Sequence, residues 1–332
     1  MRLKERTKNF LMFFLRFGLS TVLLVYLFHK IDTQKMSETL KNADLRYIVL
    51  GALVFLVIHC FLLIRWLIFI KALNLKIPFS SIVRYFFIGL FFNLFLPTST
   101  GGDVVKTLFL FKDTEHKAEA VATVVADRLF GFISIALVAT VAFIFGHRLI
   151  DDNSILWLIG ILAGACFMIT LVLFNEKLYS FCCRIFRPFP SIEEKLMNFH
   201  YAIALLKGKH STIVWTVGIS CFTQLLLAVS FYFVAKAFGQ HISFGYFPIF
   251  VPIICVISSL PSIGGLGVRD VGSAYLFTKT GMVASVAVSM SLMSFLYMVL
   301  IGLIGGVFYV IALSPRRVQC DQADSGMCPR KT

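Results

Sequence analysis

The chain alternates between long apolar stretches and short polar connections. An α-helix needs about 20 mostly apolar residues to cross a bilayer, and several windows meet this length. Strands of a membrane barrel would instead alternate apolar and polar positions in segments of about 10 residues, a pattern that this chain lacks. The pattern therefore predicts an all-α polytopic membrane protein with about six full spans, near residues 10–28, 47–70, 118–145, 155–174, 212–238 and 282–313.

Two further apolar stretches are each interrupted by proline, glycine and charged residues. Residues 96–106 read Leu-Pro-Thr-Ser-Thr-Gly-Gly-Asp-Val-Val-Lys, and residues 260–270 read Leu-Pro-Ser-Ile-Gly-Gly-Leu-Gly-Val-Arg-Asp. Proline removes a backbone donor and disfavours helix at the preceding residue, while glycine permits backbone conformations closed to other residues. Each break is therefore predicted to separate two short helices. Asp103 is expected to cap the helix that follows the first break.

A short helix, a break and a second short helix are typical of a re-entrant hairpin, whose non-helical backbone must be buried or line a polar cavity. Three full spans separate the two breaks, so the hairpins are expected to enter the membrane from opposite sides. This arrangement is an inverted repeat in which broken helices form a site near the midplane. Two independent helix kinks, or two full crossings at each break and ten spans in total, are the alternatives.

Composition and charge agree with a membrane protein. Only 14% of residues are charged, against about 25% in soluble domains. The net charge of +14 lies mostly in short loops, which indicates cytoplasmic loops and cytoplasmic termini rather than nucleic-acid binding. Residues 1–313 are interpreted as one transmembrane domain and residues 314–332 as a disordered cytoplasmic tail. Arg65, near the end of the second span, is expected to extend its charge to the membrane surface.

The two breaks carry residues suited to binding an anion. Glycine turns and helix N-termini present free backbone donors, while Lys106 and Arg269 add positive charge. Adjacent charges at 127 and 128 lie inside a predicted span and are costly unless paired or facing a cavity. No metal or other cofactor is expected, because the cysteines and histidines lack metal-site spacing. The candidate substrate-binding residues are Pro97, Ser99, Thr100, Gly101, Gly102, Asp103, Lys106, Asp127, Arg128, Pro261, Ser262, Gly264, Gly265, Gly267, Arg269 and Asp270.

These motifs resemble the lysylphosphatidylglycerol synthetase transmembrane-region family, the flippase-like domain that is also found in the multiple-peptide-resistance proteins. The resemblance covers about residues 10–313. It implies a protein of the bacterial or archaeal inner membrane that translocates a lipid or a polyprenyl-linked head group. In the full-length resistance proteins a soluble domain transfers lysine to phosphatidylglycerol. Nineteen residues follow Leu313 here, so lysyl transfer by this chain alone is not expected.

Three functional hypotheses follow. The first is translocation of an anionic or aminoacylated phospholipid, or of a polyprenyl-phosphate-linked lipid, through the polar site. The second is a membrane-embedded lipid-modifying enzyme that uses the acids Asp103, Asp127 and Asp270. The third is a non-catalytic partner of a separate synthase, bound through the basic segment 175–210. A membrane lipid is the expected ligand, and a synthase or a second copy of the chain are the protein partners left open.

Overall fold

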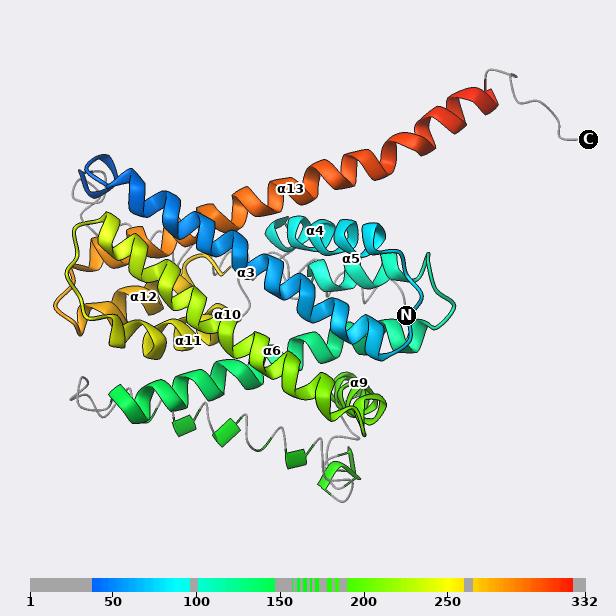
Figure 1. Cartoon of the computed structure of the whole chain (residues 1–332), viewed down its shortest axis with the longest axis horizontal. Helices are drawn as coiled ribbons and strands as arrows, with labels where there is room; N and C mark the ends of the chain where they lie inside the picture. The colour runs from blue at the N-terminus through cyan, green and yellow to red at the C-terminus, as the bar shows by residue number, and fades with distance from the viewer. Residues whose placement is uncertain are drawn as a thin grey trace, which may run out of the picture.

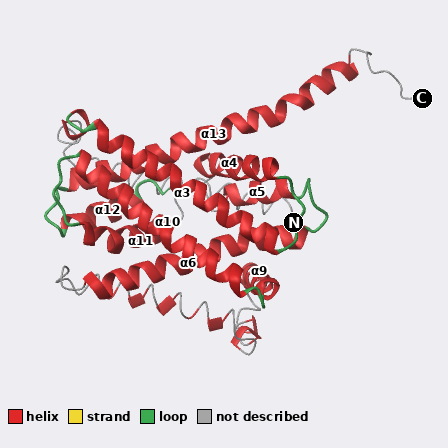
Figure 2. Cartoon of the chain, in the orientation of Figure 1, coloured by secondary structure: helices red, strands yellow, loops and turns green. Residues whose placement is uncertain are grey.

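The computed structural model describes residues 38–95, 101–146, 190–259 and 265–324, together with isolated residues between 157 and 184. Regular secondary structure in these residues is wholly helical (Figures 1 and 2). Within the described part, four helices have the length and composition of a membrane span. They are α3 (Leu45–Ala72), α6 (Lys117–Gly146), α10 (His210–Ala237) and the Ala284–Ile311 part of α13 (Ala284–Asp324).

These helices confirm four of the predicted spans to within a few residues. The predicted span at 10–28 lies outside the described residues, and the one at 155–174 is described only in part. Helix α13 continues to Asp324, beyond its apolar part.

Each predicted break lies between two shorter helices. Helix α4 (Phe79–Phe95) precedes the first break and α5 (Gly101–Leu110) follows it; α11 (Phe247–Ser258) precedes the second and α12 (Val268–Thr278) follows it. Figure 1 shows α4 and α5 together at one end of the molecule and α11 and α12 at the other. Two further elements, α9 (Pro190–Leu206) and the short 3₁₀-helix η2 (Phe244–Tyr246), precede α10 and α11 respectively.

The described helices pack around two large apolar cores, one beside each hairpin, and two smaller clusters. Large buried side chains of α10, α11, α12 and α13, among them Phe231, Phe250 and Phe277, surround the second hairpin. Trp66 and Phe69 of α3 form the other core with residues of α4, α5 and α6. Helix α11 is buried on nearly every side, as a helix that is apolar all round should be. Between the cores lies the region in which the charged side chains gather.

Glycine allows α4 to approach its neighbours closely. A Cβ atom on Gly102 of α5 would overlap the carbonyl oxygen of Gly89, and one on Gly305 of α13 would overlap that of Phe87. The two helix pairs α4–α5 and α4–α13 therefore depend on small residues at their contacts, as membrane helices often do.

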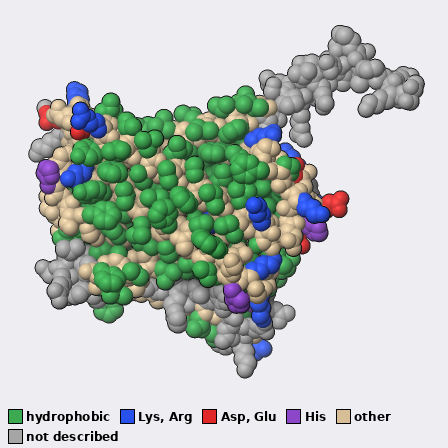
Figure 3. All heavy atoms as spheres, viewed as in Figure 1, with side chains coloured by type: hydrophobic (Ala, Val, Ile, Leu, Met, Phe, Trp, Pro, Cys, Tyr) green, Lys and Arg blue, Asp and Glu red, His purple; other side chains and the backbone are tan. Residues whose placement is uncertain are grey.

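The molecule carries an apolar belt between two polar ends. Figure 3 shows hydrophobic side chains covering the middle of the visible face, while basic and acidic side chains gather toward the two ends that carry the hairpins. Many large apolar residues of the spans are exposed, including Leu53, Val141 and Val307. Such a surface is suited to hydrocarbon and not to water.

Candidate functional site

Five charged side chains from three helices form one ion-pair network, called here the α5 network. Arg65 Nε on α3 donates a hydrogen bond to Asp127 Oδ1 on α6 over 2.8 Å. The ammonium group of Lys106 on α5 lies 3.9 Å from Asp127 Oδ2 and 3.6 Å from Asp103 Oδ1. Arg128, the next residue on α6, donates from Nε to Asp103 Oδ2. The network thus connects the helix after the first break to two membrane spans.

Two of the three cations of this network, Arg65 and Lys106, are buried inside the protein. The side chains of Arg65 and Lys106 are only 8% and 5% exposed. Arg65 Nη1 also donates to Ser220 Oγ on α10 over 2.9 Å, and the ammonium of Lys106 lies 4.3 Å from the centre of the Trp66 ring. The expectation that Arg65 extends to the membrane surface is therefore wrong. Two acceptors within reach stabilise its charge in the interior, so the side chain has no need to leave it.

A second group of charges, called here the α12 cluster, holds the turn after the second break. Asp270 Oδ2 accepts a hydrogen bond from the Gly267 amide over 2.9 Å, while Oδ1 accepts from the Ser291 hydroxyl over 2.5 Å and from Arg269 Nη2 over 3.3 Å. Arg269 Nε also donates to Ser291 Oγ over 2.7 Å. Gly267 has φ of 81°, which favours glycine. Asp270 is fully buried and fixes both the turn and the adjacent arginine.

The first break uses a different device. Gly101 and Gly102 are the first residues of α5, and Gly102 has no positive φ, so the conformational role predicted for Gly102 is wrong. Asn93 Oδ1 on α4 accepts a hydrogen bond from the Gly102 amide over 2.8 Å. This contact satisfies a donor of the helix N-terminus, which Asp103 was expected to do. Asp103 does not cap the helix, because it lies within the first turn and its carboxylate is paired with Lys106 and Arg128.

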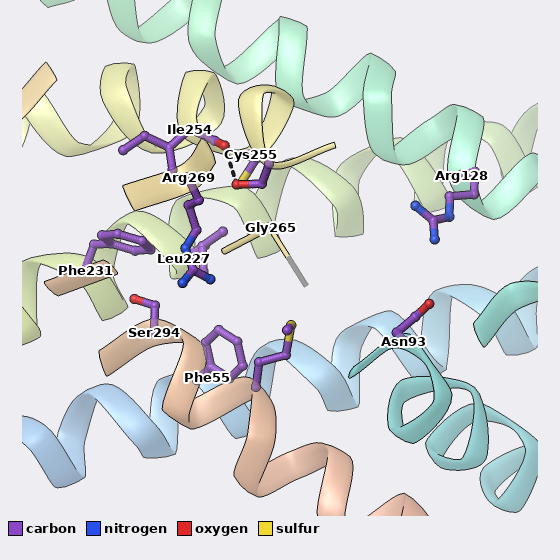
Figure 4. Close-up of a pocket in the computed structure, with 12 residues that line it drawn as sticks. Phe55, Asn93, Arg128, Leu227, Phe231, Ile254, Cys255, Gly265, Arg269 and Ser294 are labelled. Atoms are coloured by element: carbon purple, nitrogen blue, oxygen red, sulfur yellow. Dashed lines mark hydrogen bonds between the residues drawn. The ribbon is translucent and has the colours of Figure 1, made fainter. Parts of the chain in front are cut away.

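Two cavities meet at Arg128. The first, of about 340 Å³, is lined by Arg128, Arg269, Asn93 and Gly265 together with two serines and apolar side chains. Figure 4 shows Arg128 and Arg269 reaching toward this space from different helices. Among the described residues that line it, the charged ones are both arginines, and it is called here the arginine cavity. Residues from both broken hairpins therefore face one space.

The second cavity, of about 250 Å³, is lined by all five residues of the α5 network and is called here the mixed-charge cavity. Helix α10 adds Thr223 and Gln224 to its wall. Gln224 Oε1 is buried and has no hydrogen-bond partner within the described structure. Buried polar atoms are nearly always paired, so an unpaired amide on a cavity wall is available to a ligand. Arg128 lines both cavities, so the charged residues near the two breaks border two cavities that share this side chain as a wall.

The structure places the predicted site residues in these two groups where it describes them. The α5 network contains or adjoins Gly101, Gly102, Asp103, Lys106, Asp127 and Arg128. The α12 cluster contains or adjoins Gly265, Gly267, Arg269 and Asp270. The other predicted site residues lie outside the described part of the chain: Pro97, Ser99, Thr100, Pro261, Ser262 and Gly264. Within the described part, no group of three or more His, Cys, Asp and Glu residues is arranged to hold a metal ion.

Sequence reasoning missed several polar residues that complete the site. They are Arg65, Asn93, Ser220, Gln224 and Ser291. Arg65 carried a signal, because a charge inside an apolar span is by default a candidate functional residue. The serines and the amides gave little signal in the sequence, because such residues are common in membrane helices and their partners are distant in sequence.

Residues 13–306 match the sequence model of the family described as the lysylphosphatidylglycerol synthase TM region. The chain belongs to this family. A UPF0104 membrane protein of Pyrococcus horikoshii is 27% identical over 304 residues, which cover 83% of this chain and 89% of the relative. Another, from Methanothermobacter thermautotrophicus, is 23% identical over 281 residues, covering 76% and 81%. No solved structure matches the chain. The predicted family and the membrane location are thus confirmed.

Proposed function

We propose that this member of the lysylphosphatidylglycerol synthase TM region family translocates a phosphate-bearing membrane lipid, whose head group passes through the arginine and mixed-charge cavities. The observation that carries the proposal is the position of Arg128. Its side chain lines both cavities and is bonded to Asp103 on α5. A phosphate in the arginine cavity can replace Asp103 as its partner, since guanidinium binds both groups in the same bidentate manner.

The charge balance of the site favours an anionic ligand. The α5 network contains three bases and two acids, and the α12 cluster contains one of each. The described site therefore has an excess of one positive charge. A buried charge without a counter-ion is costly, and one phosphodiester would balance it. Gln224 and the carboxylates can accept hydrogen bonds from hydroxyl or amine groups of the same head group, as in an anionic or an aminoacylated phospholipid.

The helix termini add to this preference. Helices α5 and α12 both begin beside the breaks, so the positive ends of their dipoles face the region between the hairpins. Helix N-termini stabilise phosphate and carboxylate groups. Polyprenyl-phosphate-linked lipids carry the same group and belong to the same proposed class of substrate.

The two hairpins suggest how such a lipid could cross. They lie at opposite ends of the molecule (Figure 1), which supports an inverted repeat whose breaks face a common site, as in transporters with broken helices. We infer that the α4–α5 end faces the cytoplasm, because the connections there carry more described basic residues (Lys71, Lys76, Lys112, Lys117, Lys207 and Lys209) than those at the α11–α12 end (Lys41, Arg46, Lys236 and Lys279). Both termini would then be cytoplasmic, in the membrane of a bacterium or an archaeon; the two relatives named above are archaeal.

The proposal is tested with purified protein in phosphatidylcholine vesicles that contain a trace of fluorescent phosphatidylglycerol. The fraction of dye open to a membrane-impermeant reductant reports movement between leaflets. Wild-type protein is expected to raise this fraction well above that in protein-free vesicles, while D103N and R269Q protein does not. R84Q, at an exposed arginine of α4, is the matched control and should behave as the wild type.

Wild-type protein that leaves every tested lipid in its original leaflet would contradict the proposal. The tested set should include phosphatidylglycerol, its lysyl ester and a polyprenyl phosphate, because the site chemistry admits each of them. Equal losses in R84Q and R269Q would also count against it, because the effect would then not arise from the cavity.

A further inference from the structure

A third cavity, of about 470 Å³, lies between α6 and α10 and is lined almost wholly by apolar groups. Helix α6 contributes Leu137 and Val141 to its wall, α10 contributes Cys221 and Leu225, and Pro248 of α11 lies at its edge. It is called here the α6–α10 groove. Its volume is within the range of about 300–1,000 Å³ that small-molecule sites occupy.

The groove opens on the outside of the helix bundle. Val141 is 50% exposed and Leu225 is 43% exposed, and both lie on helices that have the length and composition of membrane spans. No other described helix covers this surface, which in a bilayer would face hydrocarbon chains. A ligand that enters the groove from there must itself be apolar, because a polar group would lose its hydrogen bonds to water with nothing to replace them.

The groove and the mixed-charge cavity are formed by consecutive parts of the same two helices. On α10, Gln224 lines the mixed-charge cavity and its neighbour Leu225 lines the groove. On α6, Ile135 lines the cavity and Val141 lines the groove. Six residues of α-helix span roughly 9 Å. The cavity and the groove are therefore bordered by the same two helices, at a separation that a single lipid molecule can span.

We propose that the α6–α10 groove binds one acyl or prenyl chain of the lipid whose head group occupies the polar cavities. This inference rests on the proposed function, and it adds a binding site that is separate from the charged residues. The groove would hold the chain while the head group is inside the protein, so that the lipid stays partly in the membrane as it moves.

The test compares two valine-to-tryptophan substitutions at exposed positions of two spans. V141W fills the groove from α6. V307W makes the same change on α13, where the valine is 60% exposed and is absent from the wall of the groove. For each purified variant in neutral detergent, the affinity is measured for diacyl phosphatidylglycerol and for glycerophosphoglycerol, which has the same head group and no chains.

V141W is expected to weaken binding of the diacyl lipid at least about tenfold, because the chain loses its apolar contacts. Its binding of glycerophosphoglycerol should equal that of the wild type, which also shows that the variant is folded. V307W should change neither affinity. L225W, which fills the groove from α10, is expected to weaken binding of the diacyl lipid as V141W does. It provides a second test of the groove if V141W does not fold.

Equal affinities of V141W and V307W for the diacyl lipid would overturn the inference. So would wild-type protein that binds the diacyl lipid no more tightly than the chain-free compound. The head-group site is tested separately by R269Q. Diacyl binding that is lost in V141W and unchanged in R269Q would support the groove and contradict the proposed head-group site. A wild-type protein that binds neither compound would overturn both.

Discussion

Arg128 on α6 donates a hydrogen bond to Asp103 on α5 and lines both polar cavities. The adjacent Asp127 faces a different set of partners, Arg65 and Lys106. Two neighbouring residues of opposite charge thus have different partners: Asp127 pairs with α3 and α5, and Arg128 pairs with α5. This arrangement explains how an Asp-Arg pair is tolerated within a span, and it makes the charges on α6 the link between the first hairpin and the rest of the bundle.

The Arg65–Asp127 pair should be sensitive to the loss of one partner. D127N is expected to destabilise the protein by about 3 kcal/mol, since it leaves two buried bases without a shared carboxylate. The double variant R65M/D127N should cost less than the sum of the two single changes, because removing the arginine also removes much of the unpaired charge. The measurement is unfolding in mixed micelles with increasing denaturing detergent. Additive losses would show that the two side chains do not stabilise each other.

The contact between α4 and α5 gives a second prediction. G102A is expected to destabilise the protein by about 1–3 kcal/mol, because its Cβ atom would overlap the Gly89 carbonyl and also crowd the Asn93 side chain. Gly218 of α10 is the control, since a Cβ atom there meets nothing within 4 Å. G218A should be neutral or more stable, because alanine favours helix by about 1 kcal/mol over glycine. Similar melting temperatures for G102A and G218A would contradict this account.

Sequence alone was sufficient for four of the spans and for the shorter helices on either side of each break. The spans could be predicted because a helix in lipid must be apolar for about 20 residues. In α3, for example, residues 47–64 contain no Asp, Glu, Lys or Arg. The breaks could be predicted because proline and glycine, which both disfavour helix, are clustered within residues 97–102 and 261–267. Both signals are local, so neither requires knowledge of what packs against the segment.

The partners of the charged residues could not be predicted in the same way. Arg65 and Asp127 are 62 positions apart, and only the packing of α3 against α6 brings them together. Gly102 was predicted to matter for its φ angle. The structure shows instead that its small size allows α5 to approach α4. Ser291 could not be identified at all, because one serine among several on α13 reaches Asp270 only after the second hairpin folds against that helix.

Ser291 should therefore be needed for the proposed activity. S291A removes a hydroxyl group that bonds both Asp270 and Arg269, and hydrogen bonds to charged groups contribute about 1.5–3 kcal/mol. We expect binding of glycerophosphoglycerol to weaken about tenfold or more, as Arg269 loses its fixed position. Ser289, which is buried and bonds the Ser285 carbonyl of its own helix, provides the control. If S289A weakens binding as much as S291A, the loss reflects α13 generally and not the orientation of Arg269.

The excess positive charge of the site gives the last prediction. K106M removes one buried base and makes the described site formally neutral while keeping an unbranched side chain over Trp66. Affinity for glycerophosphoglycerol should fall about tenfold or more, because the phosphodiester no longer balances a charge. K112M makes the same change at an exposed lysine just beyond the end of α5, where solvent screens the charge, and should bind as the wild type does. The affinities are measured at two salt concentrations, since the effect of a buried charge should persist at high salt whereas that of an exposed one should fade. Unchanged binding in K106M would mean that the charge balance does not select the ligand, and the arginines alone would then have to account for any binding of phosphate.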